Sequence, residues 1–160
     1  MERLLSGPTP DALERLLDEG SAFLPPSRAL GDLRAEVASR RVDGSPHTIA
    51  QIVGHMHFWQ TYTLKLARGE QPPTPAHAAE GWPDVRAEQW NAVQRAFLDG
   101  LKETKRVARE EDLSRPVREG ETLGYELTLH VIHNAVHTGQ VILLRRMLGA
   151  WPPEGGGDTW

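Results

Sequence analysis

Apolar side chains recur at helical spacing through most of this chain, and glycine and proline residues divide the pattern into blocks. No block alternates apolar and polar residues over the length of a strand, so we expect an all-α fold. The pattern predicts one short helix and four further helical segments, at about residues 12–20, 27–41, 48–68, 83–110 and 122–148. Long helices joined by short or proline-rich loops pack most simply as a four-helix bundle, whose facing side chains can build a site in the core.

The chain of 160 residues is long enough for one domain with a buried core and short of two. We therefore expect a single bundle domain over residues 1–160. Gly149 and the prolines that follow it should end the last helix, which leaves residues 150–160 as a mobile C-terminal tail. The proline-rich stretch at residues 71–75 should stiffen the connection between two helices.

Composition and charge narrow the classes of function. The net charge of -4 and pI near 6.0 offer no broad basic surface to a phosphate backbone, so nucleic acid is not an expected partner. No apolar stretch has the length of a signal peptide or approaches the ~20 residues of a membrane span, so we expect a cytoplasmic protein without a membrane partner. The chain has no cysteine, and any metal ligands must therefore be His, Asp or Glu.

Polar residues form one narrow stripe along the last predicted helix, at about 100° per residue. The members of the stripe are Glu126, His130, His133, His137 and Gln140. Leu129, Val136 and Met147 share their side of the helix, whereas Thr138 and Arg145 fall on the other side. Polar groups turned toward a core are costly unless each finds a partner, and a bound metal ion would satisfy several of them at once.

Two histidines of the 48–68 segment point in different directions, because residues two apart on a helix lie nearly opposite each other. His55 lies on the apolar arc, whereas His57 lies on the polar arc with Lys65. His55 can therefore complete a ligand set with His133 and His137, whose i, i+4 spacing lets two imidazoles reach one ion. Three neutral nitrogens would leave coordination positions open, as in catalytic sites, and zinc, nickel, iron and copper all accept imidazole. Core histidines that only bond backbone carbonyl groups are the alternative.

Further polar and aromatic residues could belong to such a site. His130 could supply an outer hydrogen bond or simply fill the core. Glu126 could accept a hydrogen bond or act as a general base, although an acidic residue near a helix N-terminus is favourable without any role in a site. Trp59 and Tyr62 could line an entrance or pack in the core. His47 precedes its helix and should be a surface residue of a turn or cap.

Two segments resemble signatures of the DinB/YfiT-like family. Residues 133–146 (HNAVHTGQVILLRR) are similar to the HxxxHxGQ motif that closes the last helix of that family, and residues 48–56 resemble its earlier metal-ligand segment. The resemblance spans about residues 29–148. It implies an up-down-down-up four-helix bundle, often a homodimer, with a histidine-rich site that binds zinc or nickel.

The resemblance also suggests chemistry. Some members of the family transfer low-molecular-weight thiols to electrophiles, and some isomerise maleylpyruvate with a thiol cofactor. This chain departs from a common pattern at Val136, where relatives often carry a further histidine, and at Thr138, where they often carry arginine. The ligand set implied by the resemblance is intact, whereas the thiol cofactor stays open.

Two functional hypotheses follow. In the first, the protein is a metal-dependent enzyme, a thiol S-transferase or a hydrolase, that acts on a small molecule in stress or detoxification. Glu126 or His130 would assist proton transfer, and Trp59 and Tyr62 would line the entrance. In the second, the bundle is a non-catalytic binding or stress-response protein whose metal is structural or vestigial. A homodimer is expected in both cases, because five tryptophans exceed what a small core readily hides.

Overall fold

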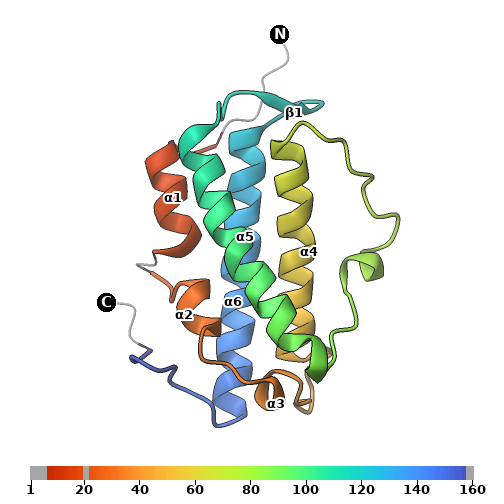
Figure 1. Cartoon of the computed structure of the whole chain (residues 1–160), viewed down its shortest axis with the longest axis vertical. Helices are drawn as coiled ribbons and strands as arrows, with labels where there is room; N and C mark the ends of the chain where they lie inside the picture. Colours follow the sequence, from red (N-terminus) through yellow and green to blue (C-terminus); the bar gives the residue numbers. More distant parts are fainter. Residues whose placement is uncertain (1–6, 20–21, 158–160) are drawn as a thin grey trace.

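The computed structural model describes residues 7–19 and 22–157, and three long helices form its centre. They are α4 (Ile49–Ala67), α5 (Trp90–Glu110) and α6 (Leu123–Met147). A shorter helix, α1 (Pro10–Asp18), packs against α5 and α6 and completes a four-helix bundle (Figure 1). The predicted all-α four-helix fold is therefore confirmed, but its fourth helix is α1, whereas the sequence pattern favours the segment 27–41 for that position.

The direction of the helices explains the long connection in the middle of the chain. In Figure 1, α1 and α6 run downward, whereas α4 and α5 run upward. Because α4 and α5 are parallel, residues 68–89 cross back along the bundle before α5 begins, and α5 starts later than the predicted residue 83. This crossover segment carries two 3-10 turns, η1 (Ala78–Gly81) and η2 (Ala87–Gln89). The order of directions agrees with the expected up-down-down-up arrangement.

Capping residues fix the starts of α4 and α6. Thr48 and Gln51 form a reciprocal capping box at the start of α4. The Thr122 hydroxyl accepts a hydrogen bond from the Tyr125 amide at the start of α6, just after a hairpin of two short strands. The strands are β1 (Pro116–Arg118) and β2 (Glu121–Thr122). The ends of both helices fall within one residue of the predicted ones.

The region predicted as one helix at residues 27–41 is broken in the structure. It forms α2 (Pro26–Leu30) and α3 (Ala35–Ala38). Side chains of α5 bond the backbone carbonyl groups at the break: Gln94 Nε2 donates to Leu30 O at 2.5 Å, and the Trp90 indole donates to Leu33 O at 2.8 Å. The prediction of a continuous helix is wrong because tertiary hydrogen bonds replace helical ones here.

The side of α6 that faces the core also differs from the prediction. The sequence pattern places Leu129, Val136 and Met147 toward the core and Thr138 and Arg145 away from it. In the structure the three apolar residues are 40% to 58% exposed, whereas Thr138 and Arg145 are each 2% exposed. The reason is that α6 is apolar on nearly every side, so its apolar pattern does not select one face. The histidine stripe lies at the edge between the buried face and the exposed one.

The C-terminal segment turns back toward α2. Arg28 donates hydrogen bonds to the carbonyl oxygens of Gly155 and Gly156, and the Glu154 amide donates to the Asp32 carboxylate. The segment predicted to be a mobile tail therefore makes contacts at residues 154–156. Residues 158–160 of that tail lie outside the described residues.

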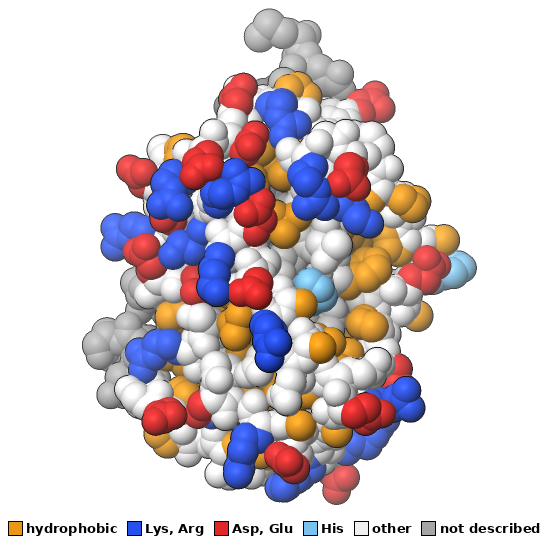
Figure 2. Space-filling model, viewed as in Figure 1, with side chains coloured by type: hydrophobic (Ala, Val, Ile, Leu, Met, Phe, Trp, Pro, Cys, Tyr) orange, Lys and Arg blue, Asp and Glu red, His pale blue; other side chains and the backbone are white. Residues whose placement is uncertain are grey.

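The surface shows where charged and apolar side chains gather. Lys, Arg, Asp and Glu side chains intermix over the face formed by α1 and α5, with no large area of one sign (Figure 2). Hydrophobic side chains gather where the crossover segment passes beside α4. None of the helices in the described part of the chain is long and apolar enough to cross a membrane.

Candidate metal centre

Three histidines from two helices meet inside the bundle. His55 comes from α4, and His133 and His137 come from α6. Their candidate ligand nitrogens all lie within 4.8 Å of one another, and His55 Nε2 is 3.0 Å from His133 Nε2. His57 does not join them, since it is half-buried and its Nδ1 lies 3.3 Å from Gln60 Oε1. The structure thus brings together the three histidines that the helical projection selects and leaves out the fourth.

Hydrogen bonds orient two of the three imidazoles. His55 Nδ1–H donates to the Gly81 carbonyl oxygen at 2.6 Å, and His137 Nδ1–H donates to Gln140 Oε1 at 2.7 Å. A ring that donates from Nδ1 keeps the lone pair of Nε2 free, which is the usual way in which an outer hydrogen bond prepares a histidine for a metal. His133 Nδ1 is buried and has no hydrogen-bond partner among the described residues.

The electrostatics of the cluster keep its imidazoles neutral. Burial, which is the largest cause, and the neighbouring histidines together lower the pKa of His133 to about 3. Burial is also the main cause of the lowered pKa of His55 and of His137. Neutral imidazole is the form that coordinates a metal. A set of three neutral nitrogens held within reach of one another fits a divalent ion that accepts imidazole ligands.

Trp82, from the crossover segment, lies between the rings of His55 and His47 and forms a stack of three rings with them. Trp82 stacks on His55 with ring centres 3.8 Å apart, and His47 stacks on the other face of Trp82, also at 3.8 Å. Gly54 lets the crossover segment approach this closely, because a Cβ atom there would lie 2.6 Å from Val85 Cγ2. His47 directly precedes the N-cap of α4, as predicted, but it is half-buried in this stack and is less exposed than a surface residue of a turn.

A cavity of about 280 Å³ opens beside the histidine cluster. The five residues with predicted site roles that line it are Trp59, Tyr62, Glu126, His130 and the candidate ligand His133. Arg118 and Leu129 complete the lining together with Thr63 and Thr74. The arrangement places a cavity directly against a candidate metal ligand.

Glu126 is held at the wall of this cavity by an arginine that the sequence pattern does not single out. Arg118 forms a short ion pair with Glu126, pairs with Glu121 at 2.9 Å and donates to the Tyr62 hydroxyl at 3.3 Å. Burial raises the pKa of Glu126, the neighbouring Glu121 raises it further, and Arg118 opposes both effects. The sequence does not predict this role for Arg118, because Arg118 lies in the short hairpin before α6, where no helical periodicity indicates which way a side chain points.

His130 forms the inner end of the same wall. Its Nε2 lies 3.0 Å from Asn134 Nδ2, while its Nδ1 is buried without a partner among the described residues. Burial lowers the pKa of His130 to about 4, so the ring is neutral at neutral pH. Because the Asn134 Nδ2 group donates to His130 Nε2, the Nδ1 atom of the neutral ring carries the proton and can donate one further hydrogen bond.

Fold and site together define a class: a four-helix bundle with an internal three-histidine cluster that could bind a metal ion. Residues 27–141 match the model of the DinB superfamily, and this region contains all three histidines. The chain therefore belongs to the DinB superfamily, as its sequence resemblance suggests. Searches among curated proteins and among solved structures found no significant match.

Proposed function

We propose that this protein is a metal-dependent enzyme that acts on a small molecule, either as a thiol S-transferase or as a hydrolase. The observation that carries the proposal is the contact between two features: the three convergent histidines and the cavity that His133 shares with Glu126 and His130. A bound zinc or nickel ion, held by His55, His133 and His137, would turn a coordinated thiol or water into a nucleophile at neutral pH.

The side chains around the cavity have distinct proposed tasks. Glu126 would accept a proton at its carboxylate, because a carboxyl group whose pKa is raised by burial exchanges protons more readily near neutral pH. Arg118 would hold that carboxylate in place through their ion pair. Trp59 and Tyr62 pack edge to face and would shield the reacting groups from water.

An activity assay separates this enzyme from a non-catalytic binding bundle. The protein would be loaded with zinc or nickel and supplied with a chlorodinitrobenzene and low-molecular-weight thiols, or with nitrophenyl acetate in water. We expect a rate that requires the metal and that is lost in His133→Ala but kept in His57→Ala. A protein that binds the metal tightly and shows no metal-dependent rate with either substrate class would favour the binding bundle.

We also propose that two copies of the chain associate through α6. Support comes from large apolar side chains on one exposed side of this helix. They are Leu129, Ile132, Val136, Leu143 and Met147, each at least 40% exposed. Such a stripe on a monomer typically marks an interaction surface. Light scattering should show a dimer that Val136→Lys converts to a monomer, whereas Leu16→Lys, at an exposed leucine of α1, should leave it intact.

A further inference from the structure

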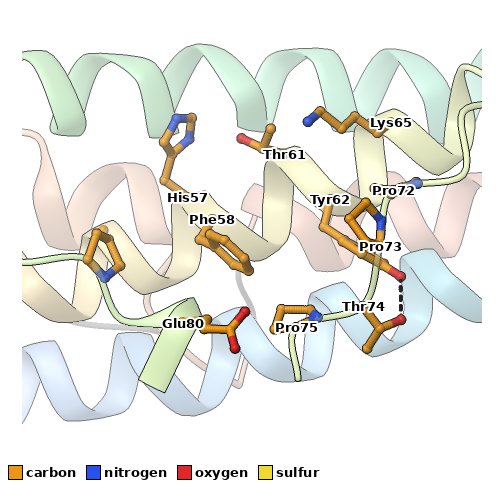
Figure 3. Close-up of a pocket in the computed structure, with 12 residues that line it drawn as sticks. His57, Phe58, Thr61, Tyr62, Lys65, Pro72, Pro73, Thr74, Pro75 and Glu80 are labelled. Carbon is orange, nitrogen blue, oxygen red and sulfur yellow. Dashed lines mark hydrogen bonds between the residues drawn. The ribbon is translucent and has the colours of Figure 1, made fainter. Parts of the chain in front are cut away.

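A second and larger cavity lies on the other side of Tyr62, between α4 and the crossover segment (Figure 3). Its volume is about 570 Å³, within the range of small-molecule sites. The apolar lining consists of Phe58, Tyr62, Pro72, Pro73, Pro75 and Pro83. None of the three clustered histidines lines it. We call this space the outer pocket.

One hydrogen bond separates the outer pocket from the cavity at the histidine cluster. Tyr62 and Thr74 line both spaces, and their hydroxyl groups lie 3.1 Å apart, as the dashed line in Figure 3 shows. The outer pocket also borders the segment that orients the metal ligand, because Glu80 in its wall directly precedes Gly81, whose carbonyl bonds His55. The two spaces are neighbours with different linings.

Charges of opposite sign stand on opposite walls of the outer pocket. Lys65 comes from α4, and Glu80 comes from η1 across the pocket (Figure 3). Neither of these two side chains forms an ion pair with another described residue. The Glu80 carboxylate accepts one hydrogen bond, from the His77 amide to Oε1, which leaves Oε2 available.

The space between the two charges is mainly apolar, although His57, Thr61 and Thr74 also line the pocket. Phe58 projects into it from α4, and prolines of the crossover segment form the facing wall (Figure 3). Proline rings lose little conformational entropy when a ligand packs on them, since their backbone is already restricted. An occupant that fits this lining has an apolar middle, an acidic end for Lys65 and a basic end for Glu80.

We propose that the outer pocket binds a small zwitterionic molecule with an apolar body, of the kind represented by a dipeptide with free amino and carboxyl ends. The carboxylate pairs with Lys65, beside the Thr61 hydroxyl, and the ammonium group pairs with Glu80. Apolar side chains of the ligand pack on Phe58 and the prolines. This site is separate from the metal centre and does not depend on metal or on catalysis.

The test uses the metal-free full chain and leucyl-phenylalanine in four forms: free, N-acetylated, C-amidated, and blocked at both ends. Amide NMR titration measures each Kd and shows where the ligand binds. We expect the free dipeptide to bind about two- to fivefold more tightly than either singly blocked form, as is typical of one exposed ion pair. The shifted amides should lie in α4 around residues 58–65 and in η1.

Two charge-removing variants assign the ends of the ligand. Lys65→Gln should abolish the preference for the free carboxylate over the amide and keep the preference for the free amine. Glu80→Gln should do the reverse. Lys102→Gln is the matched control, because Lys102 lies on α5 and pairs with Asp99. Absence of binding, shifts outside the outer pocket, or charge preferences that survive both variants would overturn the proposal. None of these outcomes bears on the metal site.

Discussion

Two groups of buried polar side chains lie on α6, and they differ in how fully they are hydrogen-bonded. Near the C-terminal end, Arg145 donates to the carbonyl oxygens of Ala29 and Ala150 and holds the Asp32 carboxylate with two further bonds of 2.8 and 3.1 Å. In the histidine region, four buried polar atoms have no partner among the described residues. They are His130 Nδ1, His133 Nδ1, Asn134 Oδ1 and Thr138 Oγ1.

The difference in hydrogen bonding distinguishes a structural anchor, formed by Arg145 and its partners, from a candidate binding site, formed by the histidine region. A buried polar group that bonds every neighbour ties the fold together, whereas each one left unpaired costs about 1–3 kcal/mol. Several unpaired polar atoms within three turns of one helix are expected where the region binds a ligand, an ion or water. Arg145 is 2% exposed, and His130, Asn134 and Thr138 are 2% to 3% exposed, so burial alone does not distinguish the two groups.

The largest expected effect comes from breaking the anchor. Arg145→Met removes four hydrogen bonds and leaves the Asp32 carboxylate with only the Glu154 amide as a partner, so we expect the free energy of unfolding to fall by about 2–4 kcal/mol. Metal content should stay unchanged. Urea denaturation and mass spectrometry of bound metal measure both quantities. The control is Arg146→Met, which removes an exposed cation stacked on Trp151 and should cost less than about 1 kcal/mol. Equal losses in the two variants would contradict the assignment of Arg145 as an anchor.

The second prediction concerns stability against pH in the metal-free protein. His130 titrates at about 4 when folded and at about 6.5 when unfolded. As pH falls below the unfolded value, the unfolded chain takes up a proton that the folded chain does not, so stability is complete above about pH 6.5 and is lost progressively toward pH 4. At about pH 5, His130 should account for a loss of about 2 kcal/mol. Denaturant titrations at about pH 6.5 and about pH 5 measure the free energy of unfolding, which should decline less in His130→Gln than in the original protein. An identical decline would show that His130 is not held neutral by burial.

Prediction from sequence succeeds where a local signal fixes the answer. Capping residues determine the ends of α4 and α6, and the rotation per residue separates His55 from His57. It fails where partners lie far apart in the chain: Trp90 and Gln94 break the 27–41 helix from α5, and the crossover segment brings Trp82 onto His55. The core side of α6 is misjudged for a third reason, because buried Thr138 and Arg145 look like surface residues until their surroundings are known.

The third prediction is the loss of metal on removal of one ligand. His55→Ala, His133→Ala and His137→Ala should each lower metal affinity by at least about tenfold, because one of three nitrogens is lost. His57→Ala should retain the metal content of the original protein, since that ring faces away from the cluster. Mass spectrometry of the purified variants, with circular dichroism to check folding, tests this. A metal-free His57→Ala beside a loaded His55→Ala would reverse the assignment.

Metal affinity should also respond to pH, but weakly. Three exposed imidazoles with the ordinary pKa of about 6.5 would lose about a thousandfold in affinity between pH 7.5 and pH 5.5, because each must be neutral to coordinate. Burial lowers the pKa of all three histidines, so their neutral forms persist to lower pH. We therefore expect the loss over that range to be clearly smaller than a thousandfold and to steepen at lower pH. Calorimetric titration with zinc or nickel measures it, and a thousandfold loss would mean that the ligands are exposed.

The smallest expected effect has the opposite sign. Thr138 lies next to His137, and its buried hydroxyl has no partner among the described residues. Valine has nearly the same shape without the hydroxyl, so Thr138→Val should raise the stability of the metal-free protein by about 0.5–1 kcal/mol. Thr138 lines a separate pocket with Phe23 and Leu24 and does not line the cavity at the histidine cluster, so the gain should persist once zinc is added. A gain that disappears with zinc would instead link this hydroxyl to the metal site. Thermal unfolding with and without zinc distinguishes these cases, and Thr104→Val provides the contrast.

The Thr104 hydroxyl donates to the Gly100 carbonyl at 2.7 Å, so its removal should destabilise the protein in both conditions. Destabilisation by Thr138→Val in the metal-free protein would show that the hydroxyl is satisfied there and would weaken the distinction between anchor and site.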